Sequence, residues 1–243
     1  VLDDIDFRYV SESVASTMIN KLKEFIRMIL VYLQSFFKEI RLKMDTMMVR
    51  ERLSANADKL AELLRQNPLQ QNKLIPIHGN LMLSIAQRNI LSLSAKLVNI
   101  ISTSKRANVS EWYRRVSQIQ NMYDKTMYKI IYDTHEETIF NSVLVLKTKT
   151  KNIDTDMENV EKSSNMILDS IDRCITQYKH INENEIDALS ERISVLQALA
   201  TTVSKVAFSI EESIIKFVLI LHDDIIGGFM RNGIIHDPST WRV

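Results

Sequence analysis

Glycine and proline are scarce in this chain, which has four glycines and three prolines among 243 residues. From Asn80 to Ile226 neither residue type occurs at all. Glycine and proline are the main punctuators of turns and strands, so a stretch that lacks both and is rich in Leu, Ile, Lys and Glu excludes most sheet architectures. The sequence therefore predicts long helices joined by short polar connections.

The chain also has a single cysteine, almost no net charge and no long apolar run. Cys174 is the single cysteine, which excludes an intramolecular disulfide. Lys and Arg together number 31 and Asp and Glu 30, and a formal net charge of +1 gives no reason to expect a nucleic-acid partner. The longest apolar stretch, from Phe25 to Phe37, is interrupted by Arg27 and is shorter than the roughly 18 residues that span a bilayer. We therefore expect no transmembrane segment.

Apolar residues, which make up 45 % of the chain, recur at the three- and four-residue steps of helical faces. We expect an all-α fold, an elongated antiparallel bundle of five to seven helices without a sheet. The expected helical regions cover about 4–66, 81–102, 110–148, 153–178 and 185–226.

We expect these helices to form a single domain over residues 1–243. Pro68, Pro76 and Gly79 mark residues 66–80 as a loop or hinge, and Gly227 begins an irregular C-terminal tail over residues 227–243. The last helix has the most regular seam, and its predicted buried residues are Leu189, Ile193, Leu196, Val203, Ile210, Ile214 and Phe217.

No complete metal-binding motif is present. No histidine follows a glutamate by three residues, as a di-iron bundle would require, and the zincin-like pattern that begins at His135 lacks its second histidine. The densest group of ligand-type residues is His222, Asp224 and His236. A cation site is one interpretation of this group. The other is a solvated helix end, because neighbouring helical residues point in different directions. We expect no cofactor.

Nucleophilic and acid–base catalysis find no support in the sequence. Cys174 occupies an apolar helical position between Ile171 and Tyr178, which favours a buried thiol over a nucleophile. The adjacent carboxylates Glu211 and Glu212 are interpreted as a solvated face. No glycine-rich phosphate loop or nucleophile elbow occurs. We therefore name no catalytic residue and expect a protein that is not an enzyme.

Two groups of side chains suggest binding. Trp112, Arg114 and Arg115 combine an aromatic ring with cations and could contact an anionic partner, although Trp112 would equally serve in the core. Methionine and phenylalanine line adaptable apolar cavities, and a cavity for a lipid could form at four positions in the first helix. The alternative for these four is ordinary core packing. They are Phe25, Met28, Phe36 and Phe37.

The chain begins Val1-Leu2-Asp3-Asp4, as a processed or cropped chain would, and Asn108-Val109-Ser110 matches the glycosylation sequon. With its helical body and lack of catalytic motifs, the chain resembles secreted salivary proteins of blood-feeding insects, of the mosquito 34-kDa type. The resemblance implies a secreted protein that acts on host molecules or immune cells. It covers the general character of the chain and carries over no functional residue.

The leading hypothesis is a non-enzymatic, secreted helical interaction protein whose surface binds a macromolecular partner, such as a host protein. A carrier of lipid or another small hydrophobic ligand is the first alternative. A viral or cellular assembly protein, in which heptad faces pair between chains, is the second. A cytoplasmic location remains the alternative to secretion, and the oligomeric state stays open.

Overall fold

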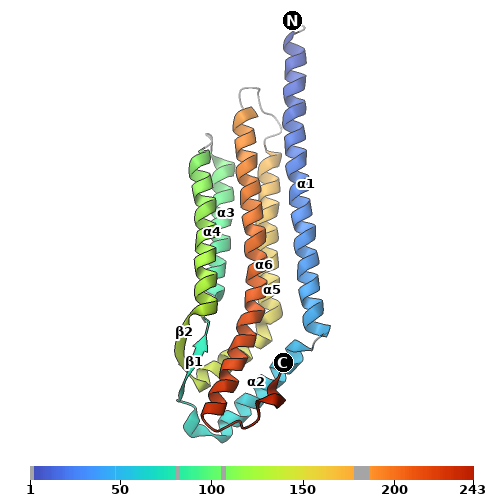
Figure 1. Cartoon of the computed structure of the whole chain (residues 1–243). Helices are drawn as coiled ribbons and strands as arrows, with labels where there is room; N and C mark the ends of the chain where they lie inside the picture. Colours follow the sequence, from blue (N-terminus) through green and yellow to red (C-terminus); the bar gives the residue numbers. More distant parts are fainter. Residues whose placement is uncertain (1–2, 47, 80–82, 105–107, 178–185) are drawn as a thin grey trace. The chain divides into compact units, whose positions relative to one another are not determined.

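The computed structural model describes residues 3–46, 48–79, 83–104, 108–177 and 186–243. It is 86 % helical, and the described residues form six α-helices and one two-stranded sheet (Figure 1). The elements are α1 (Asp3–Thr46), α2 (Val49–Gln66), the 3-10 turn η1 (Pro68–Gln70), β1 (Leu74–His78), α3 (Leu83–Thr103), α4 (Val109–Tyr132), β2 (Thr134–Thr138), α5 (Ile139–Thr176), α6 (Ile186–Arg231) and the 3-10 turn η3 (Pro238–Trp241).

The expectation of a mainly helical protein is confirmed, and the expectation that no sheet occurs is wrong. β1 and β2 pair antiparallel, with Leu74 opposite Thr138 and His78 opposite Thr134. β1 lies inside the expected loop over residues 66–80, and β2 interrupts the helix expected over residues 110–148. The arrangement of the helices as one elongated antiparallel bundle stays a prediction.

Alternating burial explains why a strand forms although it contains Pro76. Ile75 and Ile77 are each 1 % exposed, whereas their neighbours on β1 face outward. Beyond β1, Gly79 takes a φ of 92°, and its N–H donates to the carbonyl oxygen of Asp133 at 2.8 Å. After β2, the Thr138 hydroxyl accepts from the N–H of Asn141 at 3.2 Å and so caps the start of α5.

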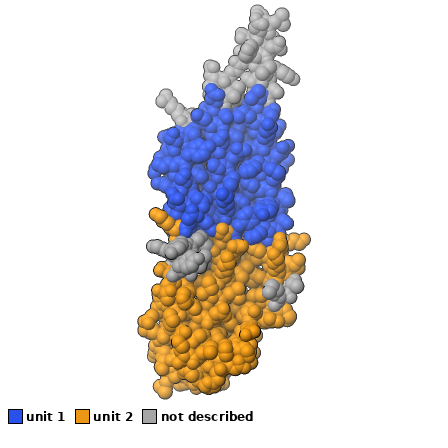
Figure 2. Space-filling view, in the orientation of Figure 1, with its two compact units in different colours: residues 1–36, 85–124, 161–208 blue, residues 37–84, 125–160, 209–243 orange. Residues whose placement is uncertain are grey.

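The chain divides into two compact units, shown in different colours in Figure 2. Unit 1 comprises residues 1–36, 85–124 and 161–208, and unit 2 comprises residues 37–84, 125–160 and 209–243. Each unit has buried apolar residues of its own, so each is described separately.

In unit 1 the core includes a buried guanidinium group. Arg192 of α6 is 7 % exposed and donates hydrogen bonds to the carbonyl oxygens of Ile101 at 3.1 Å and Ser104 at 2.9 Å. These carbonyls lie at the C-terminal end of α3, where backbone acceptors lack helical partners. The Arg192 guanidinium also lies over the Trp112 ring, 5.3 Å from its centroid. One side chain thus ties α6 to α3 and α4.

In unit 2 the core is built from α2, the sheet, α5 and the second half of α6. Its members share an exposed fraction of 7 % or less and include Leu53, Leu60, Leu64, Ile75, Ile77, Ile139, Val143, Leu146, Ile210, Leu221, Ile225 and Phe229. Outside this core, Arg50 of α2 forms ion pairs with Asp45 and Asp154.

The predicted seam of the last helix is confirmed, because all seven of its named residues are 7 % exposed or less. Of the described helices, α6 has the length and apolar composition to cross a membrane, and 61 % of its apolar window is buried inside the molecule. A core helix passes the same test, so this feature alone does not indicate a membrane protein.

The end of α6 differs from the expectation. The helix continues through Gly227 and Gly228 to Arg231, instead of stopping near Ile226. It ends where Gly233, with a φ of 70°, donates to the Met230 carbonyl and Ile234 donates to the Phe229 carbonyl, both at 2.9 Å. This is the paired hydrogen-bond pattern of a glycine-terminated helix.

Gly228 serves a close helix–strand contact. A Cβ atom at this position would lie 2.7 Å from Cγ2 of Ile75 on β1, a distance that side chains do not tolerate. At Gly227 the nearest atom to a Cβ would be Nη1 of Arg231, at an ordinary 3.4 Å. The sheet can therefore pack against α6 only where the helix lacks a side chain.

These adjacent glycines predict opposite effects of the same substitution. Gly228→Ala should lower the free energy of unfolding by about 1–3 kcal/mol, because the methyl group overpacks against Ile75. Gly227→Ala should raise it by about 0.5–1 kcal/mol, because alanine loses less backbone entropy in a helix. Urea denaturation followed by circular dichroism measures both. Equal effects at the two positions would contradict the close contact.

Candidate functional site

The ligand-type residues near the end of α6 do not converge on one point. His222 is 1 % exposed; its Nε2 lies 3.0 Å from Nδ2 of Asn56, and its Nδ1 lies 3.0 Å from Oδ1 of Asp223. Both ring nitrogens are therefore engaged. Asp224 contacts a different histidine, and His236 is exposed in the C-terminal segment. Among the described residues, no three or more His, Cys, Asp or Glu side chains form a group that could hold a metal ion.

Asp224 and His78 form a pair that the sequence did not reveal. The Asp224 carboxylate accepts from the backbone N–H of His78 at 2.7 Å, and its other oxygen lies 2.9 Å from Nδ1 of His78. The two residues are 146 positions apart and meet because β1 packs against α6. The double contact fixes the end of β1 on the helix.

Asn56 joins three segments of unit 2. Its side-chain amide, 5 % exposed, contacts Nε2 of His222 and also donates to the carbonyl oxygen of Trp241 at 2.9 Å. One amide group thus links α2 to both α6 and the C-terminal segment. Asn56 and His222 are both buried, so their contact lies inside unit 2.

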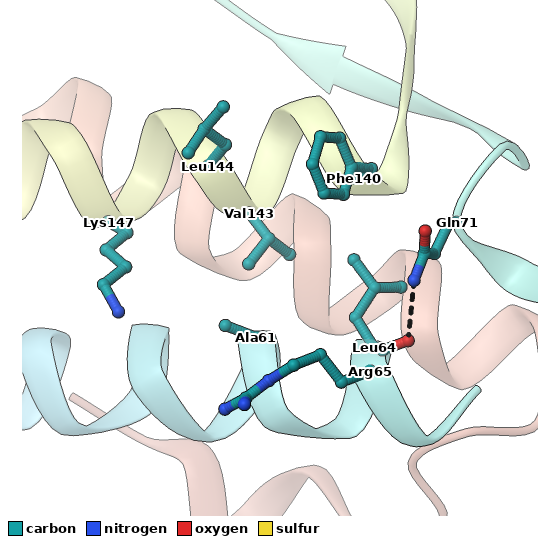
Figure 3. Close-up of a pocket in the computed structure, with 8 residues that line it drawn as sticks. All are labelled: Ala61, Leu64, Arg65, Gln71, Phe140, Val143, Leu144 and Lys147. Carbon is teal, nitrogen blue, oxygen red and sulfur yellow. Dashed lines mark hydrogen bonds between the residues drawn. The ribbon is translucent and has the colours of Figure 1, made fainter. Parts of the chain in front are cut away.

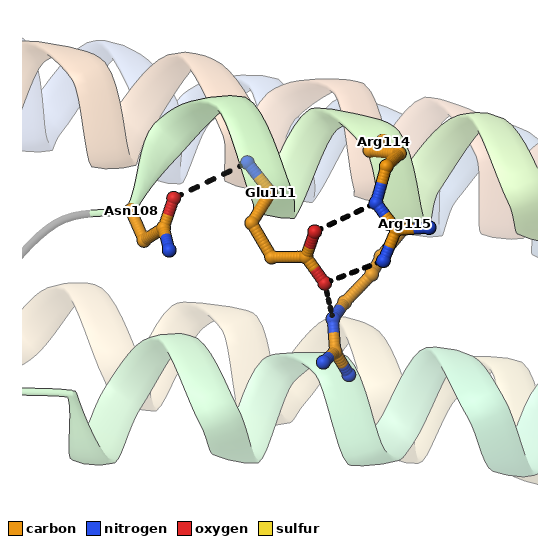
Figure 4. Close-up of polar contacts among 4 residues, drawn as sticks. All are labelled: Asn108, Glu111, Arg114 and Arg115. Carbon is orange, nitrogen blue, oxygen red and sulfur yellow. Dashed lines mark hydrogen bonds and ion pairs between the residues drawn. The ribbon is translucent and has the colours of Figure 1, made fainter.

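The aromatic and cationic residues predicted to bind a partner are separated by burial. Trp112 is 2 % exposed and belongs to the core of unit 1. The side chains of Arg114 and Arg115 are 57 % and 44 % exposed, and both donate to the Glu111 carboxylate, at 2.6 Å and 2.9 Å (Figure 4). Partner binding by this group stays a prediction, with the two arginines as the accessible members.

The Glu111 carboxylate is the acid most strongly affected by its surroundings in this group. Hydrogen bonds from Arg114 and then from Arg115 lower the pKa of Glu111 to about 2. The ionised form is favoured because both partners carry a positive charge. Glu111 therefore stays ionised in moderately acidic solution and continues to occupy both guanidinium groups.

The four α1 residues of the predicted lipid cavity differ in burial, and the cavity stays a prediction. Met28 is 63 % exposed, whereas Phe37 is 1 % exposed. Phe36 packs edge-on against Phe208, with ring centroids 4.4 Å apart, and Phe25 is half-buried.

An apolar groove does occur in unit 2, between α2 and α5 (Figure 3). Leu64 and Val143, each 3 % exposed, belong to its floor, and Phe140 and Leu144, 48 % and 53 % exposed, line it further out. Its volume is about 200 Å³. The remaining lining residues are Ala61, Arg65, Gln71 and Lys147.

Backbone and side-chain hydrogen bonds fix one end of this groove. The N–H of Phe140 donates to the carbonyl oxygen of Gln71 at 3.1 Å, and Nε2 of Gln71 lies 3.3 Å from the carbonyl oxygen of Leu64. The segment after η1 therefore connects the end of α2 to the start of α5. The two helices that line the groove are held together independently of any ligand.

Sequence reasoning missed the groove, although a signal for it exists. Ile139-Phe140 and Val143-Leu144 are two apolar pairs one helical turn apart, which makes the apolar arc of α5 wider than one buried face requires. Ile139 and Val143 fill the core, whereas Phe140 and Leu144, which follow them in the chain, face outward.

Comparisons with protein-family models, curated proteins and solved structures give no match to the chain. The function is therefore inferred from the geometry of the groove and its surroundings.

The first site prediction concerns Glu111. Because its folded pKa of about 2 is below its ordinary value, its stabilising contribution is complete above that ordinary value and is lost as the pH falls through about 2. Replacing both Arg114 and Arg115 by Gln should raise the pKa toward the ordinary value. A carbon-13 NMR titration of the side-chain carboxyl measures this, with Arg65→Gln as a control that leaves Glu111 unchanged. A midpoint that stays near 2 without the arginines would contradict the assigned cause.

Proposed function

We propose that this chain is a non-enzymatic helical interaction protein that binds another protein through the α2–α5 groove. The observation that carries the proposal is the half-exposed pair Phe140 and Leu144 beside a hollow floored by Leu64 and Val143. Exposed apolar side chains next to a concave apolar surface are typical of recognition sites for protein side chains.

The size of the groove favours protein side chains over a lipid. Pockets for drug-sized ligands have volumes of about 300–1,000 Å³, and this groove has about 200 Å³. A space of that size accepts one or two apolar side chains of a partner. Helices commonly bind in such grooves by presenting side chains three or four residues apart. The partner in this proposal presents leucine- or phenylalanine-type side chains at that spacing.

The polar clusters of unit 2 support a structural role for the residues that would otherwise suggest chemistry. Both ring nitrogens of His222 are engaged, and Asp224 uses one oxygen on the backbone N–H of His78. The contacts with Asn56 and with His78 connect α6 to α2 and to β1. In this proposal these residues hold the elements of unit 2 together, and the binding surface itself requires no catalytic group.

A displayed library of random peptides tests the groove even though its partner is unidentified. Selection on the full chain should enrich peptides with two apolar side chains at helical spacing. Their affinity, measured by fluorescence anisotropy, should fall by at least about tenfold for Leu144→Glu, because a charged side chain would be desolvated in the groove. Met166→Glu is the matched control, since Met166 is also on α5, is 60 % exposed and does not line the groove. Peptides that bind both variants equally well would contradict the proposal.

Secretion is a second part of the proposal, and Asn108 provides its test. Asn108 is exposed, and its Oδ1 lies 3.4 Å from the N–H of Glu111 near the start of α4. The side-chain nitrogen, which would carry a glycan, is not used in that contact. Expression of the chain behind a secretion signal in eukaryotic cells should give a larger mass that N-glycosidase removes. Ser110→Ala should abolish the increase while Asn108 remains in place. A secreted chain without the increase would remove the support that the sequon gives to secretion.

A further inference from the structure

The charged rim of the α2–α5 groove is defined as its two lining cations, Lys147 and Arg65, with the carboxylates that pair with them. Lys147 of α5 pairs with Asp58 of α2 at 2.6 Å, and Arg65 pairs with Glu62 on α2 itself. The side chains of Lys147 and Asp58 are 57 % and 60 % exposed. The four groups sum to zero net charge, so the rim does not select a partner with an excess of either sign.

A neutral rim with paired charges is what a self-complementary surface requires. In a symmetric dimer the same patch serves both subunits, so each charge must meet its opposite on an identical surface. The groove offers this, because Asp58 and Lys147 of one copy can face Lys147 and Asp58 of the other. The pairs inside one copy are exposed and therefore weak, so exchanging partners costs little.

The apolar side chains are self-complementary in the same way. Phe140 and Leu144 project beside a hollow that accepts one or two side chains, so one surface holds both the projecting groups and the space that receives them. Two further exposed leucines, Leu69 at 90 % and Leu74 at 57 %, flank Gln71, whose carbonyl accepts from the N–H of Phe140. Stable interfaces bury about 1,200–2,000 Å² in total, and exposed leucines beside the groove are apolar surface that a dimer can bury.

We infer that the partner bound by the groove is a second copy of this chain, in a symmetric dimer formed by α2 and α5 of each copy. This inference rests on the proposed function and names the partner. In the dimer, Leu144 of each copy enters the groove of the other, and Lys147 and Asp58 pair between copies.

Sedimentation velocity over a concentration series tests the inference on the full chain. The unaltered chain should show a dimer fraction that rises with concentration. Leu144→Glu should weaken the dimer by at least about tenfold, and Met166→Glu should leave it unchanged. Circular dichroism of each variant verifies that the helical content is retained.

Two charge reversals give a sharper test. Lys147→Asp alone places two carboxylates opposite each other, one from each copy, and Asp58→Lys alone places two ammonium groups opposite each other. Each variant should dimerise more weakly than the unaltered chain. In a mixed dimer of the two variants, each contact between the copies joins a carboxylate to an ammonium group. An equal mixture of the variants should therefore form this mixed dimer, and native mass spectrometry should detect it.

Each outcome separates the two proposals. A chain that stays monomeric at every concentration, or charge-reversal variants that do not recover on mixing, would overturn the symmetric dimer. If displayed peptides still bind the groove in that case, the proposed function stands with a different partner. If the chain is monomeric and no peptide depends on Leu144, both proposals fall.

Discussion

Burial of α6 on almost every side is the constraint on which both units depend. Val195, Leu196 and Leu199 are each 0 % exposed in unit 1, and Leu221 and Ile225 are 0 % exposed in unit 2. A helix that is apolar around most of its circumference has to be enclosed by other elements. Two polar side chains that α6 buries are engaged: Arg192 donates to backbone carbonyl oxygens, and His222 contacts the side chain of Asn56. The other helices supply the enclosing surfaces.

The helices could be predicted from the sequence because burial along α6 follows the three- and four-residue steps of a helix. The spacing of apolar residues does not predict the local structure at positions where contact with a residue far away in the sequence determines it. An irregular tail was expected to begin at Gly227, yet α6 continues to Arg231, and Gly228 is the point at which Ile75 approaches the helix. β1 contains Pro76, a residue that argues against a strand, and the strand forms because β2 pairs with it and α6 covers Ile75. Glu211 and Glu212 are adjacent, yet Glu211 is 0 % exposed and the side chain of Glu212 is 56 % exposed.

The candidate site was harder to predict for a related reason. Trp112, Arg114 and Arg115 are close together in the sequence, but a helix directs them differently, so the tryptophan enters the core and the arginines reach the surface. The groove depends on a boundary between two helices, α2 and α5, that are far apart in the chain. Only the doubled apolar pairs at the start of α5 signal it. A sequence pattern shows how many apolar side chains a helix carries and does not show which of them remain uncovered.

The contact between Asn56 and Trp241 has a consequence for the order in which unit 2 folds. The acceptor for the Asn56 amide is a backbone carbonyl 185 residues later in the chain. During synthesis, α2 is complete before that carbonyl exists, so this hydrogen bond of the Asn56 amide can form only after Trp241 has been added. Closing so long a loop is entropically costly and slows folding. The link between α2 and the C-terminal segment is therefore a long-range contact, which a local sequence pattern cannot establish.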